Sequence, residues 1–141
     1  MIAIDTNLLV YAHRSGLAEH RPARKAIELA SRDGRGWGIT QPSVAEFWSV
    51  VTHPASLGGP STADQAGRFL KALWQAGGQI WEPGDGFASR LLQVAGQLNV
   101  AGTRIFHLQI ALTAFDNGAV EIWTHDRAFV GLPGLRIHDP L

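Results

Sequence analysis

Short apolar runs alternate with longer segments of helical periodicity along the whole chain. The apolar runs are typical of short buried strands, and they occupy residues 2–4, 37–40, 79–81, 120–124 and 135–137. The segments with helical spacing occupy residues 7–14, 21–32, 40–51, 62–76, 85–98 and 102–118. Strands and helices that alternate in this order predict a parallel sheet with helices on both faces. We therefore expect a three-layer α/β fold with a short parallel sheet of four to five strands.

Specific residues mark several of the boundaries. Thr40 with Pro42 in the first turn opens a helix, and His53-Pro54 ends it. Asn117-Gly118 closes the helix that carries His107 in its first turn. No internal repeat, low-complexity segment or linker interrupts the pattern, so we expect residues 1–141 to form a single domain.

The composition excludes several classes of protein. Hydrophobic residues make up 45% and charged residues 17% of the 141 positions, which is ordinary for a compact globular domain. The chain has no cysteine, which excludes a disulfide framework and a cysteine-based zinc site and fits a reducing cytosol. Asp5 interrupts the apolar run at the start, and no basic segment precedes it, so we expect no secretory signal. No stretch approaches the length that spans a membrane.

The charge balance limits the ways in which the chain can bind nucleic acid. Its 12 basic and 12 acidic residues give a formal net charge of zero. A domain that holds nucleic acid by bulk electrostatics is normally basic. Any contact with RNA or DNA must therefore be local, transient or assisted by a metal ion.

Three carboxylates fall at one edge of the expected sheet. Asp5 directly follows the strand at residues 2–4, and Asp126 comes two residues after the strand that ends at Thr124. Glu46 lies early in the helix that follows the strand at residues 37–40, among apolar neighbours that suit a lone carboxylate poorly. Sites in open parallel sheets form beyond the carboxyl ends of the strands. We therefore expect these three side chains to point toward a common site.

A divalent cation is the simplest reason for such a cluster. Like charges at short range repel one another and raise each other's pKa, and a bound cation removes this cost. Ligand sets of oxygen atoms alone suit Mg²⁺ or Mn²⁺. The chemistry that such a site supports is the hydrolysis of a phosphodiester by a metal-activated water.

Each acid also has a simpler interpretation. Asp5 could form an Asx-turn or cap the next helix, and Asp126 could cap the short turn or helix at residues 127–130. Glu46 could pair with an arginine. Taken together, the placement of the acids at strand ends and the apolar neighbours of Glu46 favour the metal site.

Four segments of the sequence are distinctive: "IDTNLLVYA", "SVAEFWSVVTHP", "IFHLQIALTA" and "EIWTHDRAFVGLPGLRIHDPL". Together they resemble the PIN domains, and among them the VapC toxins of bacterial toxin–antitoxin pairs. The resemblance runs from Met1 to Leu141 and implies a PIN-like three-layer fold. It also implies a metal-dependent ribonuclease of the cytoplasm that needs Mg²⁺ or Mn²⁺ and acts on RNA. The implied partners are a second copy of the chain and an antitoxin, with operator DNA bound only through the antitoxin and no membrane contact.

The family's site residues can be matched to positions of this chain. Asp5, Glu46 and Asp126 match three of its four acids. The family's pocket is also flanked by polar residues, which would hold the acids or contact the phosphate. Thr6, Asn7 and Thr124 match these positions.

The position of the family's remaining acid carries a histidine. That acid usually begins an Asp-x-x-Ile-Ala pattern, which here reads His107-Leu108-Gln109-Ile110-Ala111. Imidazole binds Mn²⁺, Fe²⁺ or Zn²⁺ but is a poor ligand for Mg²⁺. Three outcomes are open, in this order: activity with Mn²⁺, binding of a softer metal, or loss of catalysis with retained antitoxin binding. On composition alone, His107 would be a partly buried, hydrogen-bonded and inert residue.

The leading hypothesis from the sequence is an endoribonuclease toxin. One alternative is a catalytically weakened PIN-fold protein that acts through antitoxin and operator binding. Another is a PIN nuclease for RNA processing without an antitoxin. His125, adjacent to Asp126, could reach the rim of the site, although neighbours at a strand end usually diverge.

Overall fold

The computed structural model describes residues 1–141 and contains the predicted alternation of strands and helices. The strands are β1 (Ile2–Ile4), β2 (Trp37–Thr40), β3 (Gln79–Trp81), β4 (Glu121–Trp123) and β5 (Arg136–His138). The helices are α1 (Thr6–His13), α2 (His20–Arg32), α3 (Gln41–Thr52), α4 (Ala63–Gln75), α5 (Phe87–Gln97) and α6 (Arg104–Asp116). All lie close to their expected bounds.

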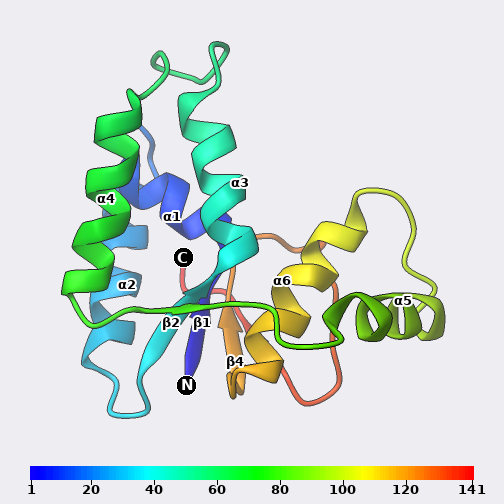
Figure 1. Ribbon diagram of the computed structural model, residues 1–141. Helices are drawn as coiled ribbons and strands as arrows, with labels where there is room; N and C mark the ends of the chain where they lie inside the picture. The colour runs from blue at the N-terminus through cyan, green and yellow to red at the C-terminus, as the bar shows by residue number, and fades with distance from the viewer.

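The five strands form one parallel sheet in the order β3-β2-β1-β4-β5. β1 is the central strand and pairs with β2 on one side and β4 on the other (Figure 1). Because all strands run in the same direction, their carboxyl ends meet at one edge. The prediction of a three-layer α/β fold with four to five parallel strands is confirmed.

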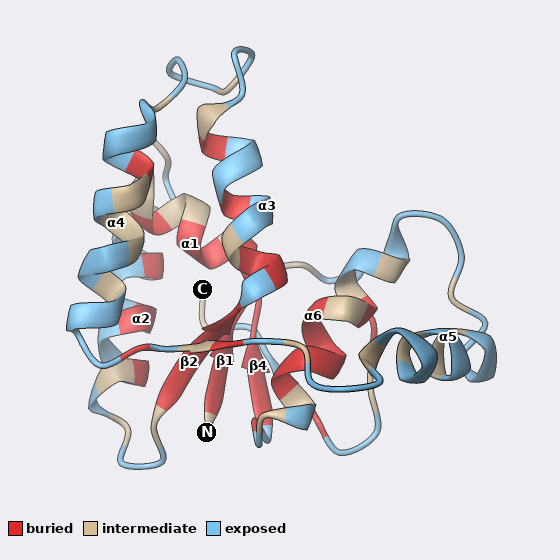
Figure 2. Cartoon of the chain, viewed as in Figure 1, coloured by how far each residue is buried: buried red, intermediate tan, exposed pale blue.

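Alternate residues of the central strands face two separate apolar clusters, as the pleat of a strand requires. On β1, Ile2 and Ile4 belong to a cluster with residues of α1, α2, α3 and α4, whereas Ala3 belongs to a cluster with residues of α6. On β4, Trp123 faces the first cluster and Ile122 the second. Figure 2 shows β1, β2 and β4 buried between these two sets of helices. Helices therefore cover both faces of the sheet.

The helix boundaries follow from residues that satisfy free backbone groups. The Thr40 side chain accepts a hydrogen bond from the Ser43 amide at the start of α3, where Pro42 occupies the first turn. Thr62 and Gln65 form a capping box at the start of α4. Gly118 adopts a φ of 92° just after α6, in the left-handed region that glycine tolerates best.

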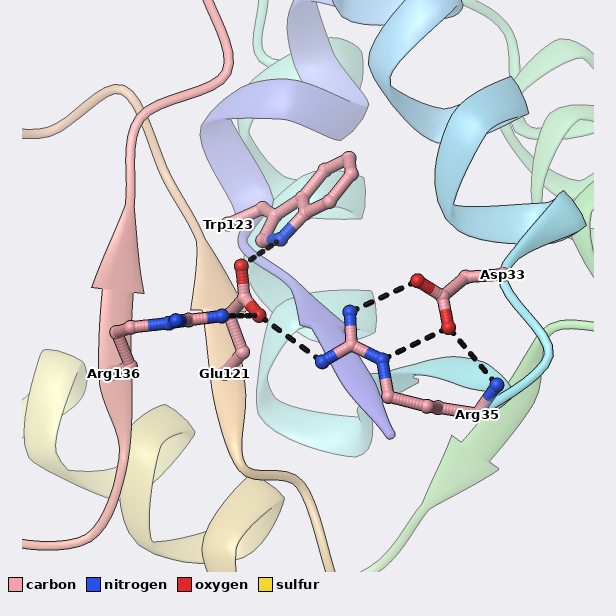
Figure 3. A network of polar contacts seen from close by, with 5 residues as sticks. All are labelled: Asp33, Arg35, Glu121, Trp123 and Arg136. Carbon is pink, nitrogen blue, oxygen red and sulfur yellow. Dashed lines mark hydrogen bonds and ion pairs between the residues drawn. The ribbon is translucent and has the colours of Figure 1, made fainter.

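A network of charges lies at the amino ends of β4 and β5, at the opposite edge of the sheet from the expected site (Figure 3). Its centre is Glu121, a side chain with 6% exposure whose Oε2 lies 2.6 Å from Arg136 Nη2 and 3.4 Å from Arg35 Nη1. The Trp123 indole donates to Glu121 Oε1 at 2.8 Å, and Asp33 holds Arg35 from the other side. Burial favours the neutral form of Glu121, but the bonds from Arg136 and Trp123 outweigh it and lower the pKa of this carboxyl. This buried carboxylate has its own counter-charges.

None of the six helices is both long enough and apolar enough to cross a membrane.

Candidate metal site

Asp5 lies between the end of β1 and the start of α1 and is 4% exposed. Its Oδ1 accepts a hydrogen bond from the Thr6 amide at 2.7 Å. Its Oδ2 accepts from the Thr124 hydroxyl at 2.7 Å and from the Asn7 side-chain amide at 3.2 Å. The interpretation of Asp5 as a helix cap is therefore confirmed. These bonds also fix the carboxylate at the carboxyl edge of the sheet.

Thr124 joins Asp5 to the loop that carries Asp126. The Thr124 hydroxyl accepts hydrogen bonds from the Asn7 side-chain amide and from the Asp126 backbone amide, both at 3.0 Å. Asn7 Oδ1 in turn accepts from the His125 amide at 3.3 Å. The three expected flanking residues, Thr6, Asn7 and Thr124, thus all lie beside Asp5, and Thr6 Oγ1 is buried without a hydrogen-bond partner.

The negative charges of Asp5, Glu46 and Asp126 influence one another. Burial raises the pKa of Asp5, and the bonds from Thr124 and Thr6 offset this only in part. Partial burial of the Glu46 carboxyl on α3 raises its pKa, and the charge of Asp5 raises it further. Asp126 adds to the rise at both residues. The topology therefore brings acids from three distant segments into one electrostatic cluster.

No arginine or lysine pairs with any acid of this cluster. The ion pairs of the structure include none formed by Asp5 or Glu46, so the alternative that Glu46 pairs with an arginine is wrong. The contrast with Glu121 is direct, because two arginines lower the pKa of that buried carboxyl, whereas the pKa values of Asp5 and Glu46 are raised. The cluster thus lacks the positive charge that the same fold supplies to its other buried acid.

His107 is the one basic side chain in contact with the cluster. Its Nε2 lies 3.3 Å from Asp126 Oδ2, and its ring stacks on Phe129 with centroids 5.1 Å apart. The Nδ1 atom is buried and has no hydrogen-bond partner. His107 is therefore at the site, as its position in the sequence predicts, and one of its nitrogens faces an acid of the cluster. The other Asp126 oxygen accepts from the Ala128 amide at 2.8 Å, so this acid also caps the following turn.

The charges of these residues fit a divalent cation, but their positions do not form a finished coordination sphere. Two carboxyls have raised pKa values and no arginine or lysine pairs with them, and a bound cation would supply the missing positive charge. No group of three or more histidine, aspartate or glutamate side chains is close enough to hold one ion together. Part of the reason is local, because Asp5 and Asp126 each use their oxygens in hydrogen bonds to the chain.

The sequence did not indicate Tyr11 and Asp139 as neighbours of the site. His125 Nδ1 lies 2.9 Å from Asp139 Oδ1, and the Tyr11 and His125 rings meet edge to face at 6.2 Å. Burial and the charges of Glu19 and Asp126 raise the pKa of Tyr11. His125 therefore turns toward the C-terminal segment while Asp126 turns toward His107. The predicted divergence of these two neighbours is confirmed, and no local pattern near residue 139 signals the contact.

Comparison with known proteins gives a consistent family assignment. The family model described as PIN domain matches residues 2–135. The protein named VapC ribonuclease Mb2897, from Mycobacterium bovis, is 30% identical over 142 residues, which covers 100% of this chain and 96% of that one.

Solved structures show the same fold at lower sequence identity. VapC20 of Mycobacterium tuberculosis, described as a sarcin-ricin loop cleaving toxin, has a TM-score of 0.69 at 11% identity, with 92% of each chain covered. A toxin–antitoxin complex from Klebsiella pneumoniae has a TM-score of 0.65 at 22% identity, with 100% of this chain and 98% of that one covered. The arrangement of five parallel strands and six helices is thus shared with these proteins.

Proposed function

The chain belongs to the PIN-domain family, and from this premise we propose that it is a metal-dependent endoribonuclease that acts as the toxin of a toxin–antitoxin pair. PIN-domain ribonucleases generally depend on a divalent metal, and a full-length relative at 30% identity is named a VapC ribonuclease. The single observation that carries the proposal is the cluster of Asp5, Glu46 and Asp126 at the carboxyl edge of the sheet with no arginine or lysine to neutralise it.

In this proposal, Asp5, Glu46 and Asp126 hold the metal and are the catalytic acids. The chemistry that a cation held by these acids would supply is a lower pKa for a bound water and stabilisation of the charge on the phosphoryl oxygens. The Asp5 carboxylate is the ligand with the most fixed orientation, because the Thr6 amide and the Thr124 hydroxyl each donate a hydrogen bond to one of its oxygens. Thr124 and Asn7 keep the Asp126 loop beside it.

His107 determines which metal the site prefers. Mg²⁺ or Mn²⁺ suits the three carboxylates, and an imidazole nitrogen 3.3 Å from Asp126 shifts the preference toward Mn²⁺ or a softer ion. As the fourth ligand in this proposal, His107 would give up its contact with Asp126. The buried Thr6 hydroxyl lies beside the Glu46 carboxyl, whose pKa it lowers, and it would contact a phosphate oxygen.

A second candidate function is supported by the same contact. Because His107 adds no negative charge to the three acids and its Nε2 lies 3.3 Å from Asp126 Oδ2, in this alternative the chain keeps a stable site without a metal. It would then act mainly by binding an antitoxin, and through it operator DNA.

The proposed protein partners are an antitoxin and a second copy of the chain. Several structural neighbours are toxin–antitoxin complexes, which supports an antitoxin partner. A homodimer is supported by α5, which contains no buried residue and exposes 72% of Leu92. RNA and an antitoxin would both be met in the cytoplasm, where we propose that the protein acts.

The deciding experiment is RNA cleavage by the purified protein with Mn²⁺ or Mg²⁺ and with EDTA. We expect cutting with metal and none with EDTA, and Asp5→Ala should lower the rate by more than about 100-fold, beyond the effect of losing a residue that only supports a metal ligand. Asp64→Ala removes an exposed acid of α4 and is the matched control. Full activity of Asp5→Ala would overturn the proposed mechanism.

A further inference from the structure

A cleft of about 540 Å³ lies between α3 and α6, directly beside the acid cluster. The two helices contact each other, and Figure 1 shows α6 beside α3. Glu46 and His107 both line this cleft, so it adjoins the candidate metal site. Its volume lies within the roughly 300–1,000 Å³ range of small-ligand sites.

The wall of the cleft presents more apolar than polar surface and carries no lysine or arginine. Two side-chain amides, those of Gln41 and Gln109, line it and form no hydrogen bond within the chain. Phe106 also lines it and is 56% exposed, so its ring is accessible from the cleft. The cleft thus combines one exposed aromatic ring with unpaired amide groups.

These features come from regular helix spacing. Phe106 and Gln109 are three residues apart on α6 and share a face of that helix. Gln41 and Ala45 are four residues apart on α3 and also share a face. The short side chain of Ala45 leaves room between the helices for a flat group.

We propose that this cleft binds one base of the RNA strand, next to the phosphate held at the acid cluster. This inference rests on the proposed ribonuclease function and adds a subsite that recognises one base of the substrate. Single-stranded RNA is recognised by stacking of splayed bases on aromatic rings and by hydrogen bonds to their edges. Phe106 supplies the ring, and the amides of Gln41 and Gln109 each supply a donor and an acceptor.

Other occupants fit this cleft less well. A phosphate track would need cations, and the only charged groups in the wall are Glu46 and His107. An amphipathic helix of a protein partner would need a row of large apolar side chains, and the wall offers only Phe106 and the buried Ile110. A nucleobase is uncharged, so it needs no cation in the wall, and it is flat and polar-edged, so it needs no long apolar groove.

The test measures binding of short single-stranded oligoribonucleotides by fluorescence anisotropy in EDTA, so that no cleavage occurs. Each oligonucleotide is compared with versions that carry one abasic position. We expect Phe106→Ala to weaken binding by about 5- to 100-fold, the range of one lost base–aromatic stack, and Phe106→Trp to restore it. Ala45→Leu, which narrows the cleft, should weaken binding in the same way.

Two matched controls separate the cleft from general surface effects. Trp74→Ala removes an aromatic side chain that is 60% exposed on α4, and Ala72→Leu enlarges an exposed alanine of the same helix. Neither should change binding. In the wild type one abasic position should weaken binding, and the same position should have no further effect in Phe106→Ala.

The possible failures are distinguishable. If the wild type with Mn²⁺ cuts no RNA, the proposed function fails. If it cuts RNA while Phe106→Ala and Ala45→Leu leave affinity and KM unchanged, the base subsite is wrong and the function stands. If light scattering shows that Phe106→Ala only dissociates a dimer, with RNA affinity unchanged, the cleft is an interface between copies and the proposal is overturned.

Discussion

The imidazole of His107 faces the carboxylate of Asp126, with Nε2 3.3 Å from Oδ2. Residue 107 is where this chain differs from the family's pattern of acids, whereas Asp126 matches that pattern. A fourth acid at residue 107 would add a negative charge that repels its neighbours and increases their dependence on a cation, whereas an imidazole adds no negative charge. The identity of residue 107 should therefore control both the choice of metal and the need for one.

The first prediction concerns that choice of metal. We expect wild-type cleavage to be faster with Mn²⁺ than with Mg²⁺, because imidazole is a poor ligand for Mg²⁺. His107→Asp should raise the ratio of Mg²⁺-supported to Mn²⁺-supported kcat/KM by about 10-fold or more, the scale on which metal-site residues act. His53→Asp makes the same change on an exposed loop residue and should leave the ratio unaltered.

Two other results would carry different meanings. If His107→Asp activates a nearly inactive wild type with both metals, the second candidate function is correct for the natural protein. An unchanged metal ratio in His107→Asp would show that residue 107 does not contact the metal.

The second prediction concerns Thr124 as a positioning residue. Thr124→Val removes the hydroxyl that bonds Asp5 Oδ2 and receives the Asp126 amide, while keeping the side-chain shape. We expect kcat/KM to fall by about 10- to 100-fold, the usual effect of losing a partner that orients a metal ligand. The metal concentration needed for half-maximal activity should rise as well, which a merely structural role would not produce.

Thr113→Val is the matched control for this variant. Thr113 is also buried, but its hydroxyl bonds only to the Gln109 carbonyl within α6. Its kinetic constants should stay near those of the wild type. Equal losses in the two variants would assign the effect to general destabilisation and remove Thr124 from the site.

The sequence predicted the positions of the acids because they depend on backbone topology. Asp5 follows a buried strand and Asp126 follows another, and the carboxyl ends of parallel strands meet at one edge of the sheet. Glu46 was recognisable from its apolar neighbours. No side-chain rotamer had to be known for any of these inferences.

The contacts of individual side chains could not be predicted from the sequence, and the reason is physical. The His125–Asp139 pair depends on β5 lying beside β4 in a register that sets Trp123 opposite His138. The pairing of Glu121 with Arg35 joins residues 86 positions apart. Such contacts depend on rotamers and strand register, which apolar periodicity does not encode.

The third prediction concerns metal-linked stability. The raised pKa values of Asp5 and Glu46 mean that their charged forms cost stability, and a bound cation offsets this cost. At a metal concentration of about 100 times Kd, the gain is about 2.7 kcal/mol, or about 5–11 °C in Tm for a chain near this size. Differential scanning calorimetry with Mn²⁺ and with EDTA measures it.

The change in Tm should depend on the acid cluster alone. Glu46→Gln should remove most of the Mn²⁺ effect, whereas Glu121→Gln, at the opposite edge of the sheet, should keep it in full. An equal Mn²⁺ effect in the wild type and in Glu46→Gln would place the ion elsewhere on the molecule.

The fourth prediction concerns the pH dependence of the Glu121 network. The bonds from Arg136 and Trp123 lower the pKa of Glu121 below its ordinary value of 4.5 despite burial. A group whose pKa is lower in the folded state stabilises the fold above its unfolded pKa, and this contribution disappears as the pH falls through the folded value. Glu121→Gln should therefore reduce the free energy of unfolding at pH 7 by about 1.5–3 kcal/mol, as expected for lost hydrogen bonds to a charged group.

Urea denaturation of the wild type and Glu121→Gln from neutral pH down to acid pH checks the sign of this effect. The difference in the free energy of unfolding should be constant at neutral pH and should shrink as the pH falls below about 4.5. The acid cluster titrates equally in both proteins, so its contribution cancels in the difference. Asp64→Asn, which breaks an exposed pair with Arg68 on α4, should change stability by no more than about 0.5 kcal/mol. A difference for Glu121→Gln that does not vary with pH would show that side-chain packing, rather than the charge of Glu121, holds this edge of the sheet together.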